Sequence, residues 1–82
     1  MQRTEIFNNV VGIIRPFAKD AEALAAVSEK SEILEDLKVN SARLVDIILE
    51  MEDAFDMEFS DEDADRVRTI GDAVDVVISK AD

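Results

Sequence analysis

The spacing of apolar residues along this 82-residue chain constrains its fold more than any other feature. Apolar side chains recur at intervals of three and four residues in several segments, which is the period of an amphipathic helix. No segment shows the alternation of apolar and polar residues that is typical of a half-buried strand. The sequence therefore predicts an all-α fold. We expect a single domain over residues 1–82, a small four-helix bundle with three main helices, a short third helix and a long loop after the first.

The first predicted helix has a broad apolar face and ends near Arg15. Pro16 lacks a backbone donor and disfavours helical geometry in the residue before it, so it is expected to stop the helix. The apolar residues of this helix are Ile6, Phe7, Val10, Val11, Ile13 and Ile14.

Residues 16–40 are predicted to form a long irregular connection. Within it, Ala21 to Val27 can add a helical turn or two, with Asp20 as the cap. Ser31 to Leu37 is too short for a stable helix. We expect this last segment to anchor the connection to the core through Ile33, Leu34 and Leu37.

The central helix is predicted to run from Ser41 to Phe55, after Asn40 as N-cap and without Gly or Pro. Its apolar residues form two adjacent stripes, so more than one side of the helix is apolar. Such a helix either lies centrally in a bundle or offers one side to a ligand or partner. One stripe contains Val45, Ile48, Leu49 and Glu52, and the other contains Leu44, Ile47, Ile48, Met51 and Phe55.

Two capping signals mark the last two helices. Ser60 followed by Asp63 is typical of a capping box and predicts a short third helix that ends at about Val67. Thr69 with Asp72 repeats the signal for the final helix. The inward face of that helix is predicted to comprise Ile70, Ala73, Val74, Val77 and Ile78.

The composition argues against catalysis by the chain's own side chains, and we expect no enzyme activity. There is no Cys and no His, so a thiolate nucleophile, a thiolate metal site and the usual general base are missing. A chain this short also lacks the volume for an enclosed active site. No apolar run nears the ~18 residues of a membrane span, and no signal-peptide core is present. We therefore expect a soluble, cytoplasmic, monomeric protein.

The charge is strongly acidic and unevenly placed. Twenty acids face nine bases, a net charge of −11 that argues against nucleic-acid binding. Residues 41–65 hold ten acids and a single base, Arg43, which amounts to −9. This segment is either a solvated face that keeps the protein soluble or a docking surface for basic patches on partners.

Acids at alternate positions also raise the question of calcium. Asp61, Asp63 and Asp65 are spaced as in an EF-hand loop, but the sixth position needs Gly and holds Arg66, and the twelfth is Asp72 rather than Glu. The start of a helix explains the acids without a metal. We predict no metal site, with a calcium-responsive acidic module as the alternative.

Ser41 is the candidate for modification. It opens the central helix, where its hydroxyl is expected to face solvent and where backbone N–H groups favour a phosphate. No base in the sequence could activate it as a nucleophile. A serine at this place is either a capping residue or a modification site.

The segment from Glu35 to Phe59, EDLKVNSARLVDIILEMEDAFDMEF, resembles the acyl carrier protein family. The family pattern, roughly E-D-L-G-x-D-S-L-x-x-V-E-L-x-x-x-x-E-E-x-F-x-x-x-I, lies on it without a gap. The similarity continues through Ser60 to Ala64 and through Thr69 and Ile70, and it covers about residues 33–80. The predicted order of elements is also that of the family.

The resemblance implies a non-catalytic carrier with 4′-phosphopantetheine attached to Ser41. The terminal thiol of this group would hold acyl or aminoacyl chains as thioesters. Implied partners are a phosphopantetheinyl transferase and the acyl-transferring or synthase enzymes of fatty-acid, lipid or secondary-metabolite synthesis. Acids that would dock on their basic patches are Asp46, Glu52 and Asp53, and residues beside the acyl chain would be Ile48 and Leu49.

Four departures from the family pattern surround Ser41. Asn40 replaces an Asp and removes a charge, and Lys38 replaces a Gly. Ala42 replaces a Leu and removes an apolar contact that transferases use, and Arg43 places a cation in the docking face. These changes favour a specialised carrier with its own partners. The alternative is a degenerate carrier fold that serves as an interaction or regulatory module without the prosthetic group.

Overall fold

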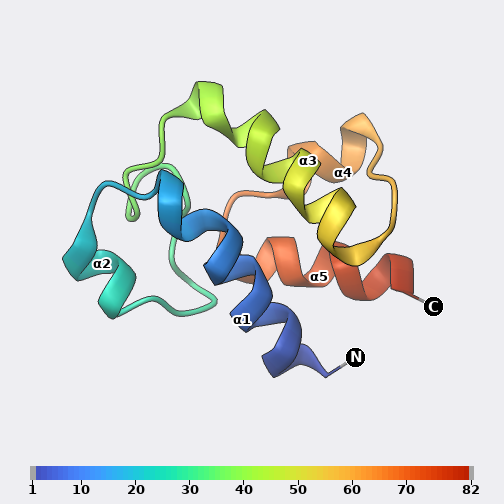
Figure 1. Cartoon of the computed structure of the whole chain (residues 1–82), viewed down its shortest axis with the longest axis horizontal. Helices are drawn as coiled ribbons and strands as arrows, with labels where there is room; N and C mark the ends of the chain where they lie inside the picture. The colour runs from blue at the N-terminus through green and yellow to red at the C-terminus, as the bar shows by residue number, and fades with distance from the viewer. Residues whose placement is uncertain (1, 82) are drawn as a thin grey trace.

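The computed structural model describes residues 2–81, and its regular structure is helical, with a long irregular connection between the first two long helices that carries only one short α-helix (Figure 1). Within these residues, the nearest approach to β-structure is an isolated bridge between Glu32 and Thr69. The all-α prediction is therefore confirmed. The α-helices are α1 (Arg3–Ile14), α2 (Ala21–Ala25), α3 (Leu44–Phe55), α4 (Asp61–Arg66) and α5 (Ile70–Ala81), with 3-10 turns η1 (Arg15–Phe17) and η2 (Ser41–Arg43).

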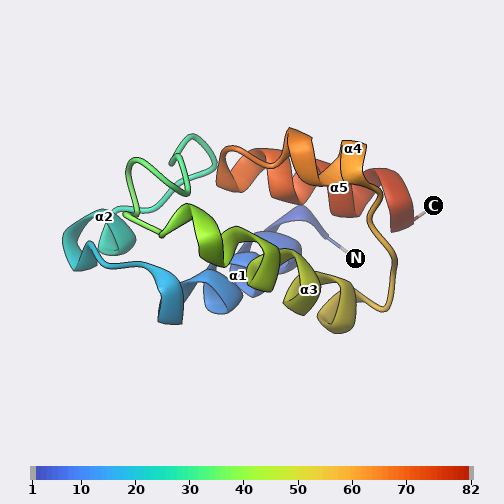
Figure 2. The same cartoon turned by 90° about the horizontal axis from the view of Figure 1, so that it is seen from above.

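The three long helices form the body of the molecule. α1 packs against both α5 and α3, and α4 packs against α5. Figure 2 shows α4 and α5 on one side of the bundle and α1 and α3 on the other, with the short α2 at one end. As predicted, α1 ends beside Pro16, and the chain continues as the 3-10 turn η1 that contains this residue.

A single apolar core joins the long helices and the connection between α1 and α3. In the connection Ile33 and Leu37 are fully buried, as predicted, whereas Leu34 is 38% exposed, so its assignment to the core was wrong. The amides of Asp36 and Leu37 both donate to the Glu32 carbonyl, which forms a helix-like turn. Positions four apart share a face in such a turn, so Ile33 and Leu37 point inward and Leu34 does not. The buried apolar residues are Ile6, Val10, Val11, Ile14, Ile33, Leu37, Val39, Ile47, Met51, Phe55, Val67, Ile70, Ala73, Val74, Val76 and Val77.

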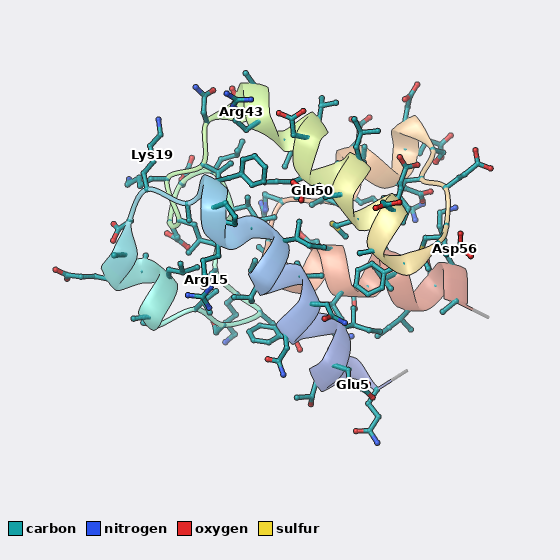
Figure 3. All side chains as sticks on the ribbon, in the orientation of Figure 1. Glu5, Arg15, Lys19, Arg43, Glu50 and Asp56 are labelled. Atoms are coloured by element: carbon teal, nitrogen blue, oxygen red, sulfur yellow. The ribbon has the colours of Figure 1, made fainter. Side chains whose placement is uncertain are left out.

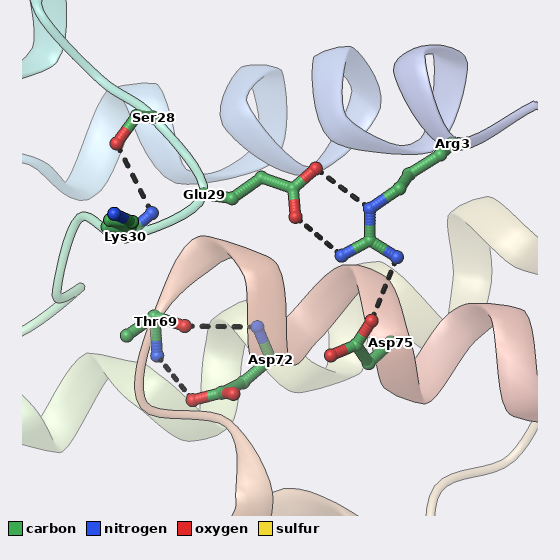
Figure 4. A network of polar contacts seen from close by, with 7 residues as sticks. All are labelled: Arg3, Ser28, Glu29, Lys30, Thr69, Asp72 and Asp75. Atoms are coloured by element: carbon green, nitrogen blue, oxygen red, sulfur yellow. Dashed lines mark hydrogen bonds and ion pairs between the residues drawn. The ribbon is translucent and has the colours of Figure 1, made fainter.

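The connection is held against the start of α5 by backbone hydrogen bonds. The amide of Ile33 donates to the Arg68 carbonyl at 3.0 Å, and the amide of Gly71 donates to the Glu29 carbonyl at 2.8 Å. Arg3 adds a side-chain clamp: its guanidinium binds the carboxylate of Glu29 and, at 2.8 Å, that of Asp75 (Figure 4). Glu29 in turn has a lowered pKa, because Arg3 hydrogen bonds favour its charged form. α1, the connection and α5 therefore meet at one cluster.

The predicted caps are present. The Ser60 hydroxyl accepts the Asp63 amide at 3.1 Å, and the Asp63 carboxylate accepts the Ser60 amide at 2.9 Å, which is a complete capping box for α4. Thr69 and Asp72 make the same reciprocal pair at the start of α5, at 3.1 and 3.0 Å (Figure 4). Asp20 caps α2 through the Ala23 amide at 3.0 Å.

Asp63 has a structural use beyond the cap. Its side chain is largely covered, and its carboxylate lies 2.8 Å from Lys80 Nζ on α5. The Lys80 hydrogen bond, and then the Ser60 amide, lower the pKa of Asp63 to about 2. Among the described residues no group of three or more acids is arranged to hold a metal ion. In that same part of the chain, no helix has the length and apolar character to cross a bilayer.

Candidate functional site

Ser41 lies at the exposed beginning of the central helix. The Asn40 side chain accepts the amide of Ala42 at 2.9 Å, and its carbonyl accepts the amide of Arg43 at 2.8 Å. Asn40 is therefore the N-cap, as predicted, and Ser41 is not the capping residue. The predicted helix from Ser41 differs in its first turn, because residues 41–43 are 3-10 and the α-helix proper starts at Leu44. The hydrogen bond from the Arg43 amide to the Asn40 carbonyl spans three residues, which is the spacing of a 3-10 turn.

The central helix has two apolar faces, as its two stripes predicted. Ile47, Met51 and Phe55 point into the core and are buried. On the other face Val45 is 64% exposed and Leu49 is 56% exposed. The second face is therefore available to a ligand, because the other helices leave it uncovered.

This second face borders a groove that begins at Ser41 and runs between α3 and α4. Its volume is about 320 Å³. Ile48 and Leu49, predicted beside an acyl chain, both line it together with Ser41. Phe59 and Ala64 also line it and were not singled out in the sequence, because only the return of the chain after α3 brings this loop and α4 to the groove. The remaining lining residues are Leu44, Val45, Ser60, Asp61 and Asp65.

The three acids expected to dock on partners differ in their surroundings. Asp53 is exposed on α3. Asp46 pairs with Arg43 at 3.1 Å, and both side chains of this pair remain accessible to solvent. The Glu52 carboxylate accepts the amide of Phe59 at 2.7 Å and so holds the loop between α3 and α4. Ala42 and Arg43, next to Ser41, are exposed.

Comparison with known proteins gives a consistent result. A family model described as "Phosphopantetheine attachment site" matches residues 12–77. The chain is similar to an acyl carrier protein from Lactobacillus acidophilus, with 35% identity over 80 residues that make up 96% of each chain. It is also similar to a solved structure of the acyl carrier protein from Enterococcus faecalis. That similarity has a TM-score of 0.77 and 35% identity, and it covers 96% of this chain and 98% of the other.

Proposed function

Because this chain belongs to the acyl carrier protein family, we propose that Ser41 is the residue to which its 4′-phosphopantetheine is attached. The observation that carries the proposal is the position of an exposed serine at the mouth of an apolar groove. The Ser41 hydroxyl has room for a substituent. Its modification would leave the cap intact, since Asn40 provides the cap. Ser41 and the apolar groove beside it therefore fit a 4′-phosphopantetheine group.

When bound, the prosthetic group supplies a terminal thiol that carries acyl or aminoacyl chains as thioesters. The chain itself, which has no Cys and no His, presents the group and shelters its cargo. Ile48 and Leu49 are the side chains we assign to the cargo, because they line the groove that starts at Ser41. Family membership disfavours the alternative of an interaction module without the group.

Partner enzymes carry out the chemistry. We expect a phosphopantetheinyl transferase to load the chain, and acyl-transferring or synthase enzymes to use it in the cytoplasm. Asp46, Glu52 and Asp53 lie on the acidic segment that would meet basic patches on these enzymes. Ala42 and Arg43 lie beside the attachment serine and would tune which transferase or synthase is accepted.

Mass spectrometry tests the attachment site. Purified apo protein is incubated with coenzyme A and a broad-specificity phosphopantetheinyl transferase, and its intact mass is measured. The wild type should gain one phosphopantetheine, and Ser41→Ala should gain nothing. Ser79→Ala is the matched control, because it removes a serine hydroxyl that bonds only within α5 and lies outside the groove, so this variant should still be loaded. Loading of Ser41→Ala, or no gain in the wild type with several transferases, would contradict the proposal.

A further inference from the structure

A second hollow lies beside Asn40 and Arg43, which flank Ser41 in the sequence, and two cations line it. It has a volume of about 520 Å³ and lies between the η1 turn that follows α1 and the residues that precede α3. Its lining includes Lys19 and Arg43, which point from the same edge of the molecule in Figure 3. The other lining residues are Pro16, Phe17 and Asn40.

Positive charge is concentrated around this hollow in an otherwise acidic protein. Residues 15–19 and 38–43 hold four of the nine bases of the chain and no acid. The two segments lie close together, because the Lys19 amide donates at 3.0 Å to the carbonyl of Leu37, the residue directly before Lys38. The hollow is therefore a local site for an anion on a chain whose net charge is −11.

Lys38 contributes to this charge at a backbone position that suits glycine. Its φ is 58°, in the left-handed region that disfavours residues with a Cβ. Its side chain is exposed, and within residues 2–81 neither Lys38 nor Lys19 forms an ion pair. Arg43 pairs with Asp46 at 3.1 Å, but both side chains are about half exposed, so the pair is weak and the guanidinium stays available.

The apolar groove that Ser41 lines has the reverse charge, because Asp61 and Asp65 line it too. An anion attached to the Ser41 oxygen would thus have the carboxylates of this groove and the cation of Arg43, two residues along the chain, as charged neighbours. Like charges repel and opposite charges attract over these distances. We therefore expect the attached anion to lie nearer to the cationic hollow than to the carboxylates.

We propose that Arg43, Lys38 and Lys19 bind the phosphodiester that joins the prosthetic arm to Ser41. This inference rests on the proposed attachment at Ser41. The cations hold the charged base of the arm at the hollow, so that the apolar groove stays free for the cargo. In this scheme the left-handed Lys38 has a use that glycine at this position could not provide.

The test compares the melting temperatures of loaded and apo protein, after loading has been confirmed by mass. At low salt, the loaded-minus-apo difference should fall by about 2–4 °C in Arg43→Gln and in Lys38→Gln relative to wild type. Lys30→Gln is the matched control, since it removes the same charge from an exposed loop position away from the hollow. It should leave the difference unchanged. At about 0.5 M salt the loaded-minus-apo difference of the wild type should fall toward that of the two hollow variants, because salt screens the attraction between the cations and the phosphodiester.

Phosphorus NMR of the loaded protein gives a second readout that does not depend on stability. The phosphodiester resonance should shift with salt in the wild type and in Lys30→Gln, and should shift less in Arg43→Gln. The proposal would be overturned if the loaded-minus-apo difference in melting temperature were the same in all variants and the phosphorus resonance responded to salt equally in all of them. A hollow that binds a carboxylate of a partner enzyme, and not the phosphodiester, would give that result. Failure to load would refute the attachment site itself, so the two failures are distinguishable.

Discussion

Gly71 lies in the first turn of α5, where the connection crosses the helix most closely. A Cβ at this position would lie 2.9 Å from the carbonyl oxygen of Glu29 and 3.2 Å from its Cβ. The Glu29 backbone cannot retreat freely. Its carbonyl accepts the Gly71 amide at 2.8 Å, and its carboxylate is held by Arg3. Gly71→Ala must therefore displace an anchored backbone.

We expect Gly71→Ala to lower the free energy of unfolding by about 2 kcal/mol. Overpacking a well-packed site costs about 1–3 kcal/mol, weakening the amide hydrogen bond adds up to about 1 kcal/mol, and the higher helix propensity of alanine offsets up to about 1 kcal/mol. A domain of this size changes its melting temperature by about 4–8 °C per kcal/mol, so the variant should melt roughly 8–16 °C below wild type. Thermal melts followed by far-UV circular dichroism, with urea titrations, measure both quantities.

The chain offers its own control in Gly12. This glycine is exposed in the last turn of α1, and a Cβ there would meet no atom within 4 Å. Gly12→Ala should therefore stabilise the protein by about 1 kcal/mol through helix propensity alone. The reasoning would be refuted if Gly71→Ala melted at or above the wild-type temperature, or if both variants shifted in the same direction.

Two further predictions concern Lys38 and Asp63. Lys38→Gly should raise the free energy of unfolding by about 0.5–1 kcal/mol, because relief of the left-handed backbone outweighs the entropy that glycine loses; Lys38→Ala keeps the strain, so equal urea midpoints for the two variants would contradict this. The protein should lose stability when the pH is lowered from 3.8, the ordinary pKa of an Asp side chain, to about 2, the pKa of Asp63 in the folded protein. In that range the Asp63 carboxylate takes up a proton more readily in the unfolded chain than in the folded one, so acid favours unfolding. Asp63→Asn should flatten the pH dependence of the melting temperature in this range, and an unchanged slope would count against the Lys80 ion pair as its source.

Features that depend on near neighbours in the sequence were predicted well. The Ser60 capping box and the Asn40 cap involve residues two or three positions apart, so the residue types alone determine the hydrogen bonds. Leu34 was misassigned because the turn around it selects one of two apolar neighbours for the core. Val76 was left out of the inward face of α5, yet it is buried in the structure.

The site was predicted less completely than the fold, because its walls come from different elements. Ile48 and Leu49 are on α3 and Ser41 is on the η2 turn that leads into it, so helical spacing along one continuous segment predicts their common face. Phe59 joins them only because the loop after α3 turns back, and the bond from Glu52 that secures this turn spans seven residues. The cationic hollow likewise forms only because Pro16, Phe17 and Lys19, which follow α1, lie beside Asn40 and Arg43. The spacing of apolar residues does not predict this contact between distant segments.

The two faces of α3 have a consequence for how such a carrier can change during evolution. Folding depends on Ile47, Met51 and Phe55, whereas the groove depends on Val45 and Leu49, which the core does not use. Mutations at the exposed pair can reshape the groove that we propose for the cargo at little cost in stability, since exposed positions tolerate substitution. Under that proposal, substitutions on one face of α3 can change cargo preference while the residues on the other face continue to hold the bundle together.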